Sequence, residues 1–507
     1  MSIPRFYEID TDPHDVYRVY SDGNFGEVAP ERLSIMSWSL IGPPMEKATR
    51  TLATKLLGSK PWFTGSAFVF LGYFGCRPYH NLAAYCQLAL EVPGVEPEDV
   101  TASYFEGIAP VEGLRRLGTG ALAKALVGPR LARCVLAVPS RLMELDGDVH
   151  ELELLAEASL GDETHTQLGH ALARGRQVLD DAWDLHITTT STLVPLRGLQ
   201  SAVGRRLVPR FDDVKPWLGS PDELVWSRLY DLSDAGDVLT WHEFLTRPFY
   251  EIADDRGPWD GYGMRHASTA SARSASSAVV DPETAFYGMV SGGRRAALEV
   301  LARRVRDGMA HREASKSLVM RVMHVMRKLV PAMATLFGLG DDWPYLTVGE
   351  LATTPVSSQP GQMALTAKSR QASVEQALLT PMAGYLDFSS GGGRGAVPSR
   401  AAAQSSGGRG VSPGTATGVV VHPSVDDLPD ADTLILVCES ADAEVQPLLP
   451  FVAGIVTARG SELSHIAILA RELGIPAIVG FKDALRLEAG STVSIDGTTG
   501  EVRVAHE

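Results

Sequence analysis

Hydrophobic and polar positions follow two different patterns along this chain. In residues 110–210 and 297–351, apolar residues recur every three or four positions, which places them on one side of a helix. This pattern predicts long amphipathic helices that pack against one another. In residues 411–507, short apolar runs alternate with turn residues and one helical segment, an order that predicts a compact α/β unit. The opening segment, up to about Leu40, shows neither pattern, so we expect irregular structure or short strands there.

The two patterns divide the chain into two domains and a tether. Residues 1–388 are predicted to form a mainly helical domain, and residues 411–507 the small α/β domain. The strands predicted in the second domain are 419–422, 433–437, 455–456, 492–495 and 501–504. Residues 389–410 are rich in Gly, Ser and Ala, which predicts a flexible linker with a reach of about 25 Å.

Composition narrows the possible partners. The 507 residues, 45% hydrophobic and 21% charged, are typical of a globular protein with about three domains. The net charge of −15 argues against nucleic acid as a partner, because no domain-wide positive field could neutralise phosphates. The four cysteines are too few for a disulfide framework and lack the CxxC spacing of a metal site, so we expect no metal and a reducing, cytoplasmic location. Basic residues interrupt the most apolar stretch, 121–143, and we recognise no signal peptide, so we expect no membrane association.

The segment 457–480 contains the strongest candidate for chemistry, His465. Ser464 stands where a helix N-cap would stand, and the following residues favour a helix that ends at Gly474. His465 would therefore open a helix. Unpaired backbone N–H groups and the positive end of the helix dipole stabilise an anion there, and a phosphoryl group is such an anion.

Two further residues of this segment are candidate contacts to that phosphoryl group. Gly460 would let the backbone approach closely, and the Thr457 hydroxyl could orient the imidazole. The alternative is a histidine that is merely buried at a helix start, and the pair Ser464 and His465 taken alone would favour it.

The string TxxGxxxSHxAIxARExGIPAxVG, followed by IDGTTGEV, resembles the swivelling phosphohistidine domain of the phosphoenolpyruvate-utilising enzymes. That family includes phosphoenolpyruvate synthase and rifampicin phosphotransferase. The resemblance implies that His465 forms a phosphohistidine intermediate and carries the group between two distant sites. It also implies that Gln446, in a preceding loop, contacts the phosphohistidine region. Ala458 and Ser461 depart from the family pattern.

A second block lies in the helix predicted within residues 297–351 and contains Arg312, Glu313 and Lys316. Arg312 and Lys316 share one helical face, where two cations suit a phosphoryl group in transfer. Such spacings also occur on solvated helices, which is the alternative from spacing alone. The Arg-Glu-x-x-Lys helix and the later string DDWPYLTVGEL resemble the central domain of the same family. The resemblance implies that these three residues belong to an acceptor-side active site.

Three other stretches resemble the substrate domain of rifampicin phosphotransferase. They are NFGEVAP followed by Trp38, GCRPYHNL with Arg77 and Tyr79, and HEFLTRPFY with His242 and Arg247. The resemblance implies that these five residues bind a small-molecule acceptor. The aromatic residues could line an apolar pocket, although aromatic clusters of this kind are also common in protein cores.

We recognise neither an ATP-grasp domain nor a GxxxxGK[ST] loop in the sequence, so the phosphoryl donor is expected to come from elsewhere. A separate ATP-grasp subunit would bind ATP and Mg²⁺ and load His465, an organisation similar to the two chains of phenylphosphate synthase. The predicted function is phosphotransfer from His465 to a hydroxyl or amine of a small molecule, either as the final step or to activate the acceptor for elimination or cyclisation. Two alternatives stay open: a non-phosphorylating ligand-binding or regulatory relative with a degenerate carrier domain, or the same fold used for other small-molecule chemistry.

Overall fold

The computed structural model describes three parts of the chain, residues 10–207, 292–389 and 408–504. Short gaps within them fall at 24, 26–31, 65, 93–94, 106–107, 109, 118–120, 163–164, 354–359, 379–381, 424–432, 440–445 and 462–463. His242, Arg247 and most of the predicted linker therefore lie outside the described residues, and the domain boundaries stay predictions.

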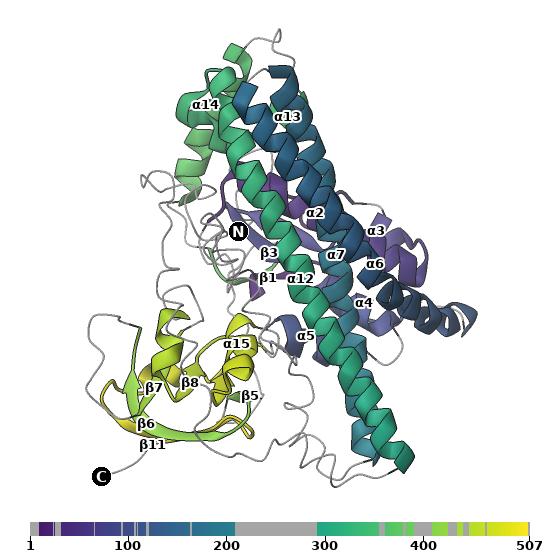
Figure 1. The fold of residues 1–507 in the computed structure, drawn as a ribbon, viewed down its shortest axis with the longest axis vertical. Helices are drawn as coiled ribbons and strands as arrows, with labels where there is room; N and C mark the ends of the chain where they lie inside the picture. Colours follow the sequence, from purple (N-terminus) through teal and green to yellow (C-terminus); the bar gives the residue numbers. More distant parts are fainter. Residues whose placement is uncertain are drawn as a thin grey trace.

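Long helices dominate the first two parts of the chain (Figure 1). Helices α6 (Ala121–Asp162), α7 (His165–Leu207) and α12 (Gly292–Leu336) pack side by side, and α2 (Ile35–Leu57) lies against α7. The shorter helices are α3 Pro61–Thr64, α4 Leu82–Glu91, α5 Pro97–Tyr104, η3 Gly340–Tyr345, α13 Val348–Thr353 and α14 Pro360–Leu378. The prediction of a mainly helical domain is confirmed. The apolar residues spaced three or four positions apart lie within these long helices, where that spacing places them on one side.

The seam between α7 and α12 is apolar along much of its length. Val319 and Val322 of α12 are buried, as is Trp183 of α7. Toward the other end of the seam, Gly308 of α12 lets the two helices approach closely, since a Cβ atom at this position would lie 2.7 Å from Leu193 Cδ2. Removal of these side chains from water is the main stabilising contribution to the pairing of the two helices.

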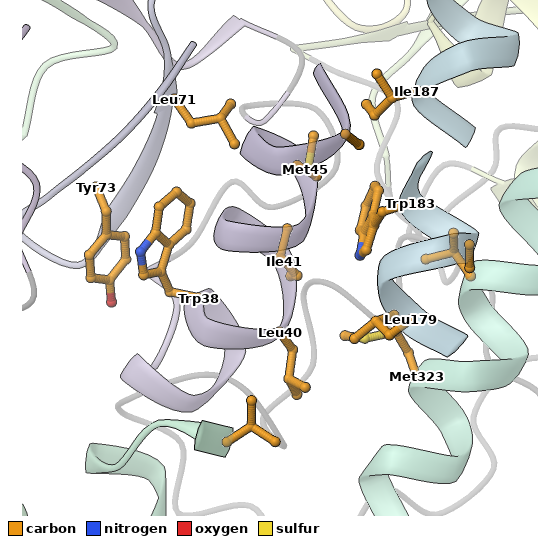
Figure 2. Packing of buried hydrophobic residues seen from close by; sticks show 14 of the residues in the cluster. Trp38, Leu40, Ile41, Met45, Leu71, Tyr73, Leu179, Trp183, Ile187 and Met323 are labelled. Carbon is orange, nitrogen blue, oxygen red and sulfur yellow. The ribbon is translucent and has the colours of Figure 1, made fainter. Parts of the chain in front are cut away.

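Helix α2 connects the helical bundle to a small sheet, and Figure 2 shows the side chains on both of its sides. Toward the sheet, Trp38 stacks on Tyr73 with the ring centroids 4.8 Å apart. Toward the bundle, Ile41 and Met45 face Trp183 of α7. Helix α2 is therefore buried on two sides.

The expectation of irregular or strand structure up to about Leu40 is wrong for residues 35–40, which form the start of α2. The local reason is an N-cap, because the Ser34 hydroxyl accepts a hydrogen bond from the backbone N–H of Ser37 at 3.0 Å. A short strand does occur earlier in this segment.

That strand is β1 (Val19–Ser21), and it belongs to a four-stranded antiparallel sheet with the order β2-β3-β1-β4. The other strands are β2 Leu71–Phe74, β3 Arg77–His80 and β4 Tyr385–Asp387. The buried carboxylate of Glu46, on α2, holds the segment that leads into β2. It accepts hydrogen bonds from the backbone N–H groups of Val69, Phe70 and Leu71 at 3.0, 2.9 and 3.0 Å.

The C-terminal unit is built on a seven-stranded mixed sheet with the order β11-β10-β6-β7-β8-β9-β5. Its elements are β5 Arg409–Ser412, β6 Thr415–Val421, β7 Leu434–Cys438, η4 Gln446–Phe451, β8 Gly454–Thr457, α15 His465–Leu473, β9 Ala477–Val479, η5 Ala484–Arg486, β10 Thr492–Asp496 and β11 Glu501–Val504. Strands β6 to β9 are parallel. The prediction of a small α/β unit is confirmed, and the five predicted strands are present.

Both faces of this sheet are covered, which explains its apolar strands. Along β7, Leu434 and Leu436 pack into the cluster that includes α15, whereas Ile435 and Val437 point to the opposite cluster. Neighbouring strand residues alternate between faces, so a continuous apolar run is needed when both faces are buried. Strands β5 and β9 were not predicted, because each is short and lies next to Gly or Pro residues.

No helix in the described part of the chain is both long and apolar enough to span a bilayer.

A buried histidine next to the small sheet gives a test of this fold. His80 ends β3 and stacks on Phe25 with the ring centroids 4.4 Å apart. Among the described residues its Nδ1 has no hydrogen-bond partner. Burial lowers the pKa of His80 to about 3, because a charged imidazole is poorly solvated at this position.

We predict that His80 makes the protein less stable in acid. The unfolded chain takes up a proton near pH 6.5, whereas the folded chain does so only near pH 3, so stability falls as the pH drops through this window. Between neutral pH and pH 5, His80 lowers the free energy of unfolding by about 2 kcal/mol. Urea unfolding at pH 7 and pH 5 measures this loss of stability. The loss should be smaller in His80→Phe and unchanged in the control His170→Phe, which replaces an exposed histidine. Equal acid dependence in both variants would contradict the prediction.

Candidate functional site

The loop from β8 to α15 places His465 at the first position of a helix, as predicted. Ser464 is the N-cap in an extended conformation, and the helix ends at Gly474 in the left-handed conformation. The Ser464 side chain is 1% exposed, and its hydroxyl has no hydrogen-bond partner within the described residues. The side chains of His465 and Gln446 are outside the described part of the structure. A buried hydroxyl thus lies directly beside the residue that opens α15.

The start of this loop is held by hydrogen bonds. The Arg459 backbone N–H donates to the Glu439 carbonyl at 2.8 Å, and the buried Thr457 hydroxyl donates to the Arg459 carbonyl at 2.5 Å. Gly460 follows with a φ of 130°, a value that L side chains rarely adopt. The structure therefore gives Thr457 a role in shaping the loop, while the predicted contacts of Thr457 and Gly460 to a phosphoryl group stay predictions.

A polar cluster interrupts the apolar seam between α7 and α12. Ser315 of α12 is fully buried, and its Oγ lies 3.1 Å from His186 Nδ1 and 2.9 Å from Thr189 Oγ1 of α7. The same hydroxyl donates to the Arg312 carbonyl at 2.7 Å. A buried polar group that lacks a hydrogen bond destabilises the folded protein. A shift of α7 along α12 would break these hydrogen bonds, so the cluster fixes the two helices in one register.

The predicted cations lie on the α12 side of this cluster. Lys316 is only 5% exposed, so it does not belong to a solvated helix face. Arg312 is half-buried one turn earlier on the same face. Glu313 lies between them in sequence, and its side chain is outside the described part of the structure. The roles of these three residues at an acceptor site stay predictions.

Tyr104, at the end of α5, reaches the same region from another direction. Its hydroxyl donates to the Thr190 carbonyl of α7 at 2.7 Å. Burial raises the pKa of Tyr104, and the positive charges of Arg312 and Arg197 oppose that rise, which places both guanidinium groups near the phenol. The Thr190 hydroxyl is buried without a hydrogen-bond partner among the described residues. Three helices thus bring hydroxyl and guanidinium groups together.

The C-terminal unit contacts the first part of the chain close to Tyr104. Arg459 Nη2 lies 3.5 Å from the Asp22 carboxylate, which follows β1 directly. The next residue, Gly23, packs against the end of α5, and a Cβ atom there would lie 3.1 Å from the Tyr104 carbonyl oxygen. In Figure 1 the C-terminal unit accordingly lies below the small sheet and beside α5. The loop that leads to His465 is thereby attached next to the region that contains Arg312.

The predicted substrate residues that the structure describes are packed against protein. Trp38 is 3% exposed and stacks on Tyr73. The Tyr79 hydroxyl donates to the Ala383 carbonyl at 2.9 Å, and Arg77 donates to the Met382 carbonyl at 3.3 Å. Arg77 also lies 4.0 Å from Asp22, so it is the member of this set that reaches the contact between the two units. Substrate binding by these residues stays a prediction.

Sequence reasoning missed Asp22, Tyr104, Thr189 and Ser315. The run 187–192, ITTTST, carried a usable signal, because hydroxyl and β-branched residues are unfavourable inside a helix unless the hydroxyls have partners. Asp22 gave no signal beyond a turn-like composition. Within the described residues there is no group of three or more His, Cys, Asp or Glu side chains that could hold a metal ion.

We predict that Ser315→Ala lowers the free energy of unfolding by about 1–3 kcal/mol, because it leaves buried polar partners on α7 without their hydrogen bond. Ser140→Ala is the matched control, since that serine also bonds the carbonyl three residues earlier in its helix but is exposed. Urea unfolding of both variants measures the difference, and an equal, small effect for both would show that the cluster does not stabilise the helix pair.

Comparison with known proteins identifies part of the C-terminal unit. Residues 431–500 match the family described as "PEP-utilising enzyme, mobile domain". Phosphoenolpyruvate synthase of Pyrococcus furiosus is 41% identical over 100 residues, which cover 19% of this chain and 12% of the relative. The prodigiosin synthesizing transferase PigC of Serratia marcescens is 51% identical over 69 residues, covering 13% of this chain and 8% of the relative.

A longer match extends beyond the size of the C-terminal unit. An uncharacterized protein of Mycobacterium tuberculosis is 34% identical over 217 residues, which cover 40% of this chain and 24% of that protein. The chain thus spans about a quarter or less of the length of these relatives. The resemblance inferred from the string around His465 is confirmed at the level of the family. This chain contains a mobile domain of the PEP-utilising enzymes, and residues 431–500 belong to it.

Proposed function

We propose that this chain is a phosphotransferase in which His465 carries a phosphoryl group to a hydroxyl or amine of a small molecule. The donor site belongs to a separate ATP-grasp subunit, which binds ATP and Mg²⁺. The observation that carries this proposal is the attachment of the His465 loop, through Arg459 and Asp22, beside the region of Arg312.

The start of α15 supports the role of His465 as the phosphoryl carrier. The match to a mobile domain supports His465 as the phosphorylated residue. The helix N-terminus favours an anion at this position, and the buried Ser464 hydroxyl has no other partner among the described residues. A phosphoryl group on the imidazole would give that hydroxyl an acceptor oxygen.

The acceptor half rests on the charges between α7 and α12. Arg312 and Lys316 lie on one face of α12, and the Tyr104 phenol lies near Arg312 and Arg197. Cations fixed in a poorly solvated region neutralise the charge on the equatorial oxygens of a phosphoryl group in transfer. PigC is named as a transferase that synthesises prodigiosin, which supports a small-molecule acceptor.

The chemistry proceeds in two displacements. First, an imidazole nitrogen of His465 attacks the donor phosphorus, so that a P–N bond forms as the donor P–O bond breaks. Then the acceptor hydroxyl or amine attacks the same phosphorus, and the P–N bond breaks. Glu313 accepts the acceptor proton, and Arg312 and Lys316 bind the phosphoryl oxygens. The phosphorylated acceptor is either the product or an activated form for elimination or cyclisation.

We predict that incubation with ATP, Mg²⁺ and an ATP-grasp partner chain adds one acid-labile phosphoryl group to the protein. Intact mass measured under alkaline conditions detects the gain, and the inorganic donor phosphoramidate is a chemical probe for the same site. His465→Ala should abolish the enzymatic gain, whereas His170→Ala, which changes an exposed histidine, should retain it. A gain that survives in His465→Ala would assign the phosphoryl group to another residue. No gain from ATP in the presence of an ATP-grasp chain would favour a non-phosphorylating relative.

We predict that Arg312→Gln and Lys316→Met leave loading intact but slow transfer about 100-fold, because each removes one cation from the developing charge. The protein is loaded with phosphoramidate, freed of reagent and mixed with the small-molecule fraction of a cell extract. Loss of the phosphoryl group from the fragment that contains His465 is then followed by mass.

Arg303→Gln and Lys328→Gln are the matched controls, because both residues are exposed on the same helix. Unchanged transfer in the Arg312 and Lys316 variants would remove these residues from the acceptor site. Thermal unfolding of each variant separates a loss of transfer from a loss of folding.

A further inference from the structure

The contact between the two units is centred on one buried carboxylate. The Asp22 side chain is 8% exposed and that of Arg459 is 29% exposed, with 3.5 Å between Oδ1 and Nη2. A second cation, Arg77, lies 4.0 Å from Oδ2. The Asp22 backbone N–H donates to the Gly384 carbonyl at 2.8 Å, so the residue is held in place by its own unit.

The burial of Asp22 makes its cationic neighbours important. Burial raises the pKa of Asp22, and Arg459 and Arg77 oppose that rise. A buried carboxylate loses the solvation that stabilises its charge, and a nearby cation restores part of it. Arg77 belongs to the same unit as Asp22 and donates to the Met382 carbonyl, whereas Arg459 is contributed by the C-terminal unit.

The position of Arg459 is coupled to the position of His465. It lies six positions before His465, on a loop held by the hydrogen bonds of its backbone to Glu439 and Thr457. Fixing the guanidinium therefore restricts where α15 can lie. On the other side of the contact, Gly23 packs against Tyr104, whose phenol lies near Arg312.

We propose that Asp22 is the docking residue of the carrier: by binding Arg459 it selects the orientation of the C-terminal unit in which His465 delivers its phosphoryl group. This inference rests on the proposed function. Asp22 is a positioning residue, since it acts through Arg459 and not on the phosphoryl group. Loading occurs on a different chain, so the ion pair must open for loading and form again for transfer.

Two half-reactions therefore respond differently to loss of the ion pair. Asp22→Asn and Arg459→Gln should slow transfer about tenfold, because the docked orientation becomes less populated. Loading should proceed at least as fast as in the unmodified protein. A residue that only stabilises the fold would impair both half-reactions alike.

The experiment combines three measurements on the full chain. Small-angle X-ray scattering of the unloaded protein reports whether the C-terminal unit separates from the rest. Loading with phosphoramidate and discharge into a small-molecule fraction give the two rates. Asp15→Asn and Arg486→Gln are the controls, because both residues are exposed and belong to the same two units as the pair. Arg459→Lys keeps the charge, so its particle size and its transfer rate should lie between those of the unmodified protein and those of Arg459→Gln.

A larger particle and slower transfer in both Asp22→Asn and Arg459→Gln, with normal loading, would support the inference. An unchanged particle size in both variants, or expansion without slower transfer, would overturn it. If His465 of the unmodified protein cannot be loaded at all, the proposed function fails. In that case, scattering of the two variants tests the docking contact alone. A larger particle supports the contact, and an unchanged particle size overturns it. Should Asp22→Asn fail to fold, Arg459→Gln provides the same test from the opposite unit.

Discussion

The pairing of α7 with α12 is the constraint on which the first part of the chain depends. Most of that seam is apolar, and the close approach at Gly308 already limits shifts of one helix along the other. The buried group of Ser315, His186 and Thr189 limits them further, because a shift would leave hydroxyl and imidazole groups without partners in a poorly solvated place. Arg312 and Lys316 lie on either side of Ser315 in sequence, so the same register that satisfies the hydroxyls also sets the positions of the cations.

The small sheet has a comparable role for Asp22. Strand β1 pairs with β4, which comes from a part of the chain more than three hundred residues later, with Tyr20 opposite Leu386. This pairing and the hydrogen bond from Asp22 to Gly384 bring the end of β1 to a fixed place next to α5. A single turn after β1 could otherwise adopt many conformations. The first part of the chain therefore combines two features built from distant segments, the seam between α7 and α12 and the Asp22 carboxylate.

Periodicity and a long motif predicted what depends on local sequence. The helices around residues 110–210 and 297–351 and the helix that begins at His465 follow from spacing, an N-cap and a helix stop, all of which are local. Asp22 and Tyr104 could not be predicted in this way, since their importance arises from contacts with Arg459 and with Thr190. The start of α2 was missed because the aromatic residues and the Gly and Pro residues before it indicated irregular structure or short strands. The Ser34 cap is the local signal for the helix, and a single serine is a weak signal.

The overall charge of the protein bears on the proposed transfer through His465. A net charge of −15 repels a phosphate anion that approaches from solution, although two cations, Arg312 and Arg197, lie near the Tyr104 phenol. We infer that a phosphoryl group bound to His465 avoids this barrier, because it arrives as part of the chain and the contact of Arg459 with Asp22 guides it. In the proposed mechanism, the predicted linker would replace diffusion with an effective concentration of about millimolar. In that mechanism, Arg312 and Lys316 would need to favour the phosphoryl group only during transfer, which is compatible with an acidic surface elsewhere.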